Sequence, residues 1–335
     1  MTRVQLSLLA GILVLCLAVA GGYFWTARRA VSQTSTPSTA TLNPSTVLAE
    51  PRIVFRNVVL GPDYSKLAMV SIADPGGPRA VTPVSCERVY ATAGSGVCVS
   101  AEQGVAPTYA VSLLDAALRP TTTDELVGLP SRARMSADGS LVSTTTFVSG
   151  HSYAQTTFST QTVVRRNGRA LSDLETWTTT LPNGTTLNQI DRNYWGVTFA
   201  GDDDTFFATA ASGGTTWLVR GSLRQRTMTA LRTDAECPSL SPDGTRIAYK
   251  KRLDQRAGTW RLAVLDLATN HETLLAETRS VDDQVEWFDG SRMLYALPRS
   301  GSEATTSDVW SVAADGSGAP AVLIEHASSP AVVRT

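Results

Sequence analysis

Four acidic residues in the second half of the chain could do chemistry or bind a charged partner. Asp282, Asp283 and Glu286 lie close together in one segment, and Glu236 lies in a similar context earlier in the chain. Carboxylate oxygens are the ligands that Ca²⁺ prefers, and a pair of carboxylates can act as the acid and base of a glycosidase. These residues are therefore candidates for binding, for calcium ligation or for acid–base catalysis.

Three arginines are the basic candidates. Arg132 and Arg134 alternate in one segment, and Arg192 precedes another. If the guanidinium groups and the carboxylates meet, the site carries both signs of charge and could hold a peptide or glycan segment. The alternative is that the charges neutralise one another in structural ion pairs. The sequence leaves both possibilities open.

Other motifs argue against several kinds of chemistry. The sequence contains no Gly-x-Ser-x-Gly nucleophile motif, so a serine peptidase is disfavoured. His151, His271 and His326 are widely spaced, which is not the pattern of a histidine metal site. The acidic run at residues 202–204 lacks the alternation of a calcium loop and is expected to form a turn. We expect no catalytic residue and no cofactor, with calcium as the open alternative.

Residues 51–335 predict a mostly β domain. Short runs of Val, Ile, Leu, Thr, Tyr and Trp alternate with Gly, Asp, Asn and Pro turns, and no helical pattern of convincing length occurs. Five of these turns recur at intervals of 44, 65, 40 and 46 residues, at Gly94, Asp138, Asp203, Asp243 and Asp289. This spacing is near the length of a four-stranded blade of a β-propeller. The long interval predicts an insertion at about residues 150–162.

The repeats also predict how the ring closes. The first repeat, from residue 52, lacks an inner strand, whereas residues 329–333 resemble the inner-strand start at Cys237. We therefore expect a six-bladed propeller of four-stranded blades in which residues 329–333 complete the first blade. The seven charged candidates would then lie at a mouth of the central channel. Four tryptophans at matching positions should pack between blades, namely Trp217, Trp260, Trp287 and Trp310.

The segment Cys237-Pro-Ser-Leu-Ser-Pro-Asp-Gly-Thr-Arg-Ile-Ala-Tyr resembles the repeat of TolB-like, WD-repeat-like propellers. In this repeat Pro242 presets a turn, Asp243 bonds the turn backbone and Gly244 takes a positive φ. Further stretches, beginning at Tyr194 and Arg279, resemble an actinobacterial group of exported TolB-like proteins. The resemblance covers residues 51–335 and implies a rigid ring that presents loops to other molecules.

The cysteines point to an oxidising compartment. Cys86 and Cys98 flank two alternating runs that meet at residues 93–96, so a hairpin would bring the sulfurs onto neighbouring strands. We expect a disulfide, with two buried thiols as the alternative. Cys237 is expected to be a buried, small apolar residue.

The N-terminal residues predict export. Residues 4–25 carry no charge and are long enough to span a bilayer core of about 30 Å, so residues 1–29 are expected to be a single-pass membrane anchor. The alternative is a signal peptide cleaved after Ala20, which would make the protein secreted. Residues 30–50, rich in Ser, Thr, Pro and Ala, are expected to be a flexible tether.

Composition completes the functional hypotheses. The chain has 335 residues and a formal net charge of −1, which does not favour a nucleic-acid partner. The leading hypothesis is a monomeric, non-enzymatic scaffold that binds an envelope protein or a cell-wall component outside the cytoplasm. The alternatives are a lactonase-like or glycan-active enzyme that uses channel carboxylates and calcium, and a sensor domain.

Overall fold

The computed structural model describes residues 41–102, 104, 106–148, 159–253 and 258–334, and three residues nearer the N-terminus, Cys16, Val19 and Gly22. Most of the predicted anchor and tether, the predicted insertion as far as residue 158, and His151 lie outside these residues. Within the described part of the chain, no helix is both long enough and apolar enough to cross a bilayer.

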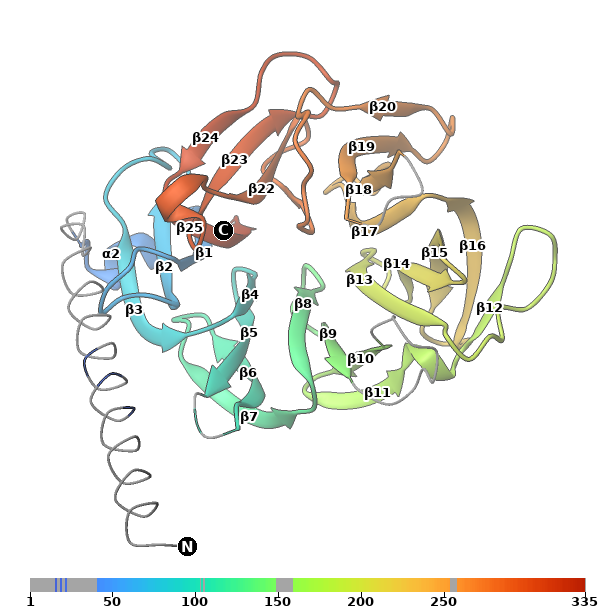
Figure 1. Cartoon of the computed structure of the whole chain (residues 1–335), viewed down its shortest axis with the longest axis horizontal. Coiled ribbons are helices and arrows are strands. Elements are labelled where there is room, and N and C mark those ends of the chain that lie inside the picture. The colour runs from blue at the N-terminus through green and yellow to red at the C-terminus, as the bar shows by residue number, and fades with distance from the viewer. Residues whose placement is uncertain are drawn as a thin grey trace, which may run out of the picture.

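The described residues form six β-sheets arranged in a ring, which confirms the predicted six-bladed propeller (Figure 1). One strand of each sheet lies nearest the central axis, and the inner strands of neighbouring blades contact one another around the ring. Short runs of β-branched and aromatic residues suit this fold because a strand exposes alternate side chains to the blades on its two sides.

The strands of each blade follow one another from the central axis outward. Blade 1 contains β25 (Ala327–Val333), β1 (Arg52–Asn57), β2 (Lys66–Ser71) and β3 (Ala80–Ser85). Blade 2 contains β4 (Arg88–Ala91), β5 (Ser95–Glu102), β6 (Thr108–Asp115) and β7 (Pro120–Leu126). Blade 3 contains β8 (Leu129–Met135), β9 (Leu141–Val148), β10 (Ser159–Arg166) and β11 (Arg169–Asp173).

Blades 5 and 6 have the same order, and blade 4 has a fifth strand at its outer edge. Blade 4 contains β13 (Asn193–Phe199), β14 (Thr205–Ser212), β15 (Thr215–Ser222), β16 (Thr227–Thr233) and, outermost, β12 (Thr178–Thr180). Blade 5 contains β17 (Ala235–Leu240), β18 (Arg246–Arg252), β19 (Trp260–Asp266) and β20 (Glu272–Leu274). Blade 6 contains β21 (Glu286–Trp287), β22 (Arg292–Pro298), β23 (Ser307–Ala313) and β24 (Ala321–Ile324). Short helices lie at α2 (Pro44–Leu48), η1 (Leu174–Thr176) and η2 (Gly301–Glu303).

The C-terminal strand closes the ring. β25 runs antiparallel to β1, with Ala331 opposite Val54. The inner strands β25 and β17 each contain a bulge of the same kind. Ser329 in β25 and Cys237 in β17 have φ values of 52° and 49°, and each of these residues precedes a proline. The similarity between the tail and the segment at Cys237 therefore reflects one shared backbone bend.

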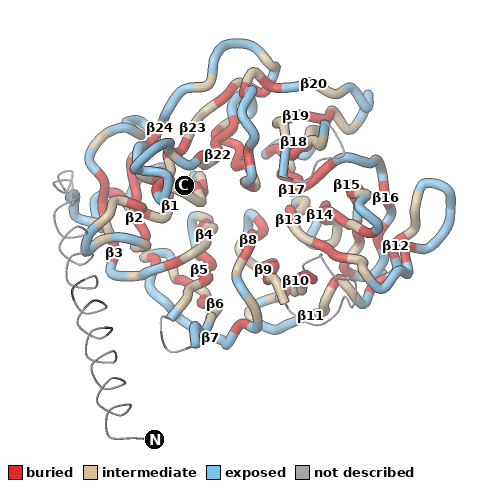
Figure 2. Tube along the Cα trace, viewed as in Figure 1, coloured by how far each residue is buried: buried red, intermediate tan, exposed pale blue. Residues whose placement is uncertain are grey.

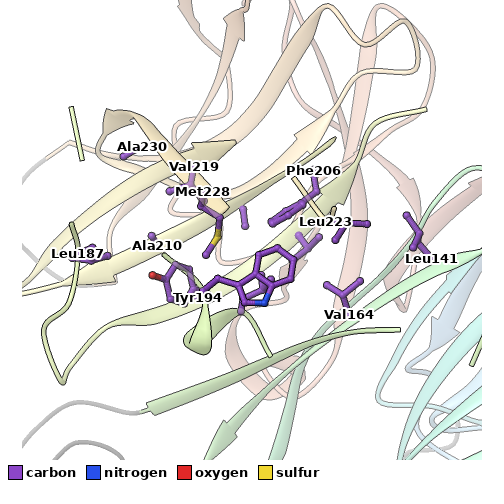
Figure 3. Packing of buried hydrophobic residues seen from close by; sticks show 14 residues of the cluster. Leu141, Val164, Leu187, Tyr194, Phe206, Ala210, Val219, Leu223, Met228 and Ala230 are labelled. Atoms are coloured by element: carbon purple, nitrogen blue, oxygen red, sulfur yellow. The ribbon is translucent and has the colours of Figure 1, made fainter. Parts of the chain in front are cut away.

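Apolar side chains join the blades. The buried residues form six clusters, and each cluster spans one of the six boundaries between neighbouring blades. At the boundary between blades 3 and 4, Leu141 and Val164 face Tyr194 and Phe206 (Figure 3). Burial is concentrated on the sheets and falls in the outer connections (Figure 2). Because burying one such side chain contributes about 1.5–3 kcal/mol, each blade depends on its neighbours for stability.

The turns after the inner strands confirm the predicted turn chemistry. Asp243 Oδ1 accepts hydrogen bonds from Ser241 Oγ (2.5 Å) and Thr245 N (3.1 Å), and these bonds lower the pKa of Asp243 to about 2. In the acidic run, Asp202 accepts from the backbone N–H groups of Asp204 and Thr205. The run therefore shapes a turn.

The predicted disulfide is present. Cys86 and Cys98 are bonded, with Cα atoms 5.5 Å apart, and they lie in the cluster between blades 1 and 2. Cys237 is buried, as expected.

The strand β10 of blade 3 corrects the C-terminal end of the predicted insertion. Ser159 to Thr162 fall within the predicted insertion but belong to β10. The long repeat also contains η1 and β12, and β12 runs parallel to β16 at the outer edge of blade 4. Three consecutive threonines carry no hydrophobic alternation, which is why the sequence does not reveal this strand.

The end of the predicted tether also differs. Asn43 caps α2 by accepting a hydrogen bond from Ser45 N, and Val47 is buried in the cluster between blades 1 and 2. Leu42 forms a bridge with Ala80 of β3. Residues 41–50 therefore dock on blade 1, because two or three apolar side chains in a Ser/Thr/Pro-rich segment are enough to hold it.

The predicted position of one of the four tryptophans is wrong. Trp217, Trp260 and Trp310 lie on the third strands β15, β19 and β23. Trp287 lies on the inner strand β21, where its Nε1–H donates to Ser239 O of blade 5 at 2.9 Å. It still joins two blades, but through a position that the other three do not share.

Candidate functional site

Six of the seven predicted site residues meet around the central axis. Arg132 and Arg134 come from β8, Glu236 from β17, Glu286 from β21, and Asp282 and Asp283 from the segment before β21. Arg192 does not join them, which corrects the prediction. Its guanidinium donates to the backbone carbonyls of Glu175 and Gln189 instead, because the turn before β13 directs it away from the others.

A buried ion pair crosses the channel from blade 3 to blade 6. Arg134 Nη1 lies 2.5 Å from Glu286 Oε2, and both side chains are more than nine-tenths buried. Arg134 Nη2 also donates to Ser239 Oγ at 3.0 Å and to Val285 O at 2.8 Å. The other Glu286 oxygen accepts from Tyr90 Oη at 3.3 Å. Burial raises the pKa of Glu286, although Arg134 opposes this shift.

Asp282 accepts hydrogen bonds from two cationic side chains. Lys250 Nζ donates to Asp282 Oδ1 at 2.7 Å, and Arg132 Nη2 donates to the same oxygen at 3.2 Å. Burial opposes ionisation of Asp282, but Lys250 and Arg132 outweigh it and lower the pKa of this carboxyl. Asp282 is therefore an ionised member of a structural charge network.

Glu236 belongs to the same network. Arg252 Nη2 lies 2.8 Å from Glu236 Oε1, and Lys250 Nζ lies 4.0 Å from Glu236 Oε2. Lys250 also lies 4.0 Å from the centre of the Trp260 ring. Lys250 thus connects two predicted acidic residues of blades 5 and 6.

Asp283 is held mainly by backbone groups. Its two oxygens accept hydrogen bonds from Gln284 N and Ala296 N, both at 2.9 Å. Arg88 is its charged neighbour, with 3.8 Å between Nη1 and Oδ1. Next in the chain, the Gln284 side chain reaches across to blades 4 and 5 and donates to Val197 O and Pro238 O.

These side chains fill the middle of the channel and leave a hollow at each end. A hollow of about 360 Å³, called the strand-end mouth, lies where the inner strands end, and its lining includes residues of all six blades. A hollow of about 480 Å³, called the strand-start mouth, lies where inner strands begin, beside Arg88, Asp282 and Asp283. Between them, a cavity of only about 20 Å³ is lined by Arg132, Arg134 and Gln284, among others.

The two mouths differ in chemistry. The strand-end mouth has the Arg134–Glu286 pair among its lining residues, and its rim includes small residues such as Ala93, Ala137 and Gly201. The strand-start mouth is lined by charged and hydroxyl side chains, such as Arg56, Glu87 and Ser307.

The channel carboxylates lie beside cations. Among the described residues, no group of three His, Cys, Asp or Glu side chains is placed to hold a metal ion. The channel carboxylates of Glu236, Asp282 and Glu286 each face an arginine or a lysine. Of the described histidines, His271 is exposed and His326 lies at a turn beside Asp308.

Sequence reasoning missed three cations of this network, Arg88, Lys250 and Arg252. Arg88 lies on β4, and Lys250 and Arg252 lie on β18, but the repeat pattern does not say which side chains on a strand reach the axis. One signal in the sequence could have indicated them. The acidic candidates outnumbered the basic ones, and buried carboxylates require cationic partners.

Solved structures share this fold. No protein-family model and no curated protein sequence matches the chain. TolB from Acinetobacter baumannii is 17% identical with a TM-score of 0.57, and the match covers 85% of this chain and 67% of that one. The fold is therefore that of a TolB-like propeller.

Weaker matches include propellers of enzymes. A puromycin-hydrolyzing peptidase from Mycobacterium tuberculosis is 15% identical with a TM-score of 0.48, and the match covers 82% of this chain and 43% of that one. A periplasmic gluconolactonase from Pseudomonas aeruginosa is 12% identical with a TM-score of 0.47, covering 84% and 99%. At these identities the likeness concerns the fold alone.

Proposed function

We propose that this propeller is a non-enzymatic scaffold outside the cytoplasm, which binds a segment of an envelope protein or a cell-wall component at the strand-end mouth. The observation that carries the proposal is the ion-pair network that fills the channel. Three of its carboxylates are held by cations and Asp283 by backbone N–H groups. Among the described residues these groups separate two open hollows, with a cavity of only about 20 Å³ between them.

The strand-end mouth is the better place for such a partner. Residues from all six blades line it, so a segment seated there touches the whole ring. Its small rim residues leave room for an incoming chain, and the Arg134–Glu286 pair adds no net charge. Rigid rings of this kind commonly bind through the loops at one end.

The disulfide supports the proposed location. Disulfides persist in oxidising compartments and are rare in the cytosol, and Cys86 and Cys98 are bonded in this structure. Together with the charge-free residues 4–25, this supports anchoring at the membrane or secretion after cleavage at Ala20. Mass spectrometry of protein recovered from the envelope tests both points, because free thiols at Cys86 and Cys98, or recovery in the cytosol, would contradict this location.

Substitution at the rim tests the binding function. Ala137 is an exposed rim residue, so Ala137→Trp should obstruct the strand-end mouth without disturbing the blades. The matched control is Ala268→Trp, at an exposed turn on the outer side of blade 5. Partners are captured by proximity labelling from cells that make the full chain. We expect Ala137→Trp to lose a partner that the wild type and Ala268→Trp both retain.

Two results would overturn the proposal. One is an identical set of partners for all three proteins. The other is turnover of lactones, peptides or glycosides by the purified chain, with or without Ca²⁺, that is lost in Asp282→Asn.

A further inference from the structure

Arg88 is an arginine of the strand-start mouth whose guanidinium has no hydrogen-bond acceptor in the described part of the chain. Its closest carboxylate oxygen is Asp283 Oδ1, 3.8 Å from Nη1, which is too long for a hydrogen bond. Both oxygens of Asp283 already accept backbone N–H groups at 2.9 Å. The side chain of Arg88 is 29% exposed and lines the hollow of about 480 Å³, so its donors are available to a ligand there.

The other acidic residues of this mouth are also engaged. Glu87 Oε2 lies 3.0 Å from Arg56 Nη2. Asp282 Oδ1 accepts from both Lys250 and Arg132. Among the described residues, neither carboxylate forms an ion pair with Arg88, whose only ion-pair partner there is Asp283.

The charges around the channel do not balance. The described side chains of the network and of the strand-start mouth include six cations and five anions, namely Arg56, Arg88, Arg132, Arg134, Lys250 and Arg252 against Glu87, Glu236, Asp282, Asp283 and Glu286. Burial lowers the pKa of Arg88, and the neighbouring Arg132 and Arg56 lower it further. One added negative charge beside Arg88 would remove both the excess charge and the unmet donors.

We propose that the strand-start mouth binds a small monocarboxylic acid whose carboxylate is held by Arg88. A guanidinium offers two parallel N–H donors, and this fork matches the two oxygens of a carboxylate. A doubly charged phosphate would exceed the single surplus charge and would lie near Asp282, Asp283 and Glu87. The volume of the hollow is within the range of small-molecule sites. This site lies at the opposite mouth from the proposed partner site.

Calorimetry with matched acids and neutral analogues tests the proposal on the full chain in detergent. The probes are N-acetylalanine with N-acetylalaninamide, glucuronate with glucose, and inorganic phosphate. We expect at least one acid to bind roughly tenfold more tightly than its neutral counterpart. The acid that binds identifies the source of the carboxylate as a peptide or a sugar acid. The proposal fails if neither acid outcompetes its neutral counterpart, or if phosphate binds more tightly than both acids.

Variants then assign the site to Arg88. Arg88→Gln should abolish binding of the acid, and Arg88→Lys, which keeps the charge but loses the fork, should weaken it about fivefold or more. Arg119→Gln is the control, because Arg119 is an exposed residue after β6 and outside both mouths. If Arg88→Gln does not fold, Arg88→Lys decides the question. Unchanged affinity in the folded Arg88 variants would overturn the assignment, whereas partner capture at the strand-end mouth is expected to survive in them.

Discussion

Arg134 and Glu286 form an ion pair between blades that lie on opposite sides of the ring, with 2.5 Å between Nη1 and Oε2. The pair links β8 to β21 through the channel, whereas the apolar clusters link only neighbouring blades. It therefore fixes the diameter of the ring at its centre.

Removing one partner of this pair should be costly. Glu286→Gln leaves the Arg134 guanidinium buried without its counter-charge, and we expect the free energy of unfolding to fall by about 3–5 kcal/mol. Urea unfolding measures the change. Glu303→Gln is the control, because the Glu303 side chain is exposed in its pair with Arg299, and this change should cost no more than about 1 kcal/mol. Equal losses in the two variants would mean that the central pair does not stabilise the ring.

Removing the closing strand should prevent folding. A chain that ends at residue 327 loses nearly all of β25, so β1 loses its inner neighbour and the apolar cluster around Val54 loses Val333. We expect no cooperative thermal transition in this protein. A chain that lacks only residues 334–335 keeps β25 and should melt almost as the wild type does. Normal melting of the shorter chain would show that the ring does not need this strand.

Gly196 should tolerate no side chain. A Cβ atom added there would lie 2.7 Å from the Cα of Cys237, in a backbone with φ of 66°. Gly196→Ala should therefore cost about 1–3 kcal/mol for overpacking, in addition to the backbone strain. Gly244→Ala is the control, because its φ is 72° but no atom lies within 4 Å of the added Cβ. This control should lose only about 1–2 kcal/mol. Equal stability of the two variants in chemical unfolding would contradict the contact with Cys237.

Glu277 should make stability depend on pH in the acid range. Burial alone would raise the pKa of the Glu277 carboxyl. Hydrogen bonds from Arg279 and Tyr295 outweigh this effect and lower the pKa to about 2. Because the folded pKa lies below the ordinary value of 4.5, the contribution of Glu277 is complete above about pH 4.5 and is lost as the pH falls toward 2. Urea midpoints between pH 2 and 6 should therefore vary less in Glu277→Gln than in the wild type. The exposed Glu125→Gln should give a curve parallel to the wild type, and parallel curves for Glu277→Gln would disprove the assignment.

Much of the fold was predictable because the propeller repeats its turns. Asp138, Asp243 and Asp289 each bond the backbone of a hairpin turn, so their spacing in the sequence reports the length of a blade. The repeat could not predict the strand β12, because β12 lies outside it. The three threonines of β12 show neither alternation of apolar and polar residues nor a turn signal.

The site was predictable only as far as it follows the repeat. Arg132 and Arg134 meet Asp282 and Glu286 because equivalent inner strands bring their residues to one axis. Arg192 precedes its strand, where the local turn rather than the repeat sets the direction of the side chain. Lys250 lies on a second strand, and only the packing of Trp260 against it and its contact with Asp282 direct it to the channel.

Closure of the ring by β25 has a consequence for synthesis. At about 5–20 residues per second, roughly 15–55 s separate the emergence of β1 from that of its inner neighbour β25. During this interval the nascent arc of blades ends in an unpaired strand edge, which is a template for pairing with other chains. The residues of β25 are therefore the ones that remove this risk of aggregation, and a chaperone that covers β1 would act until β25 has emerged.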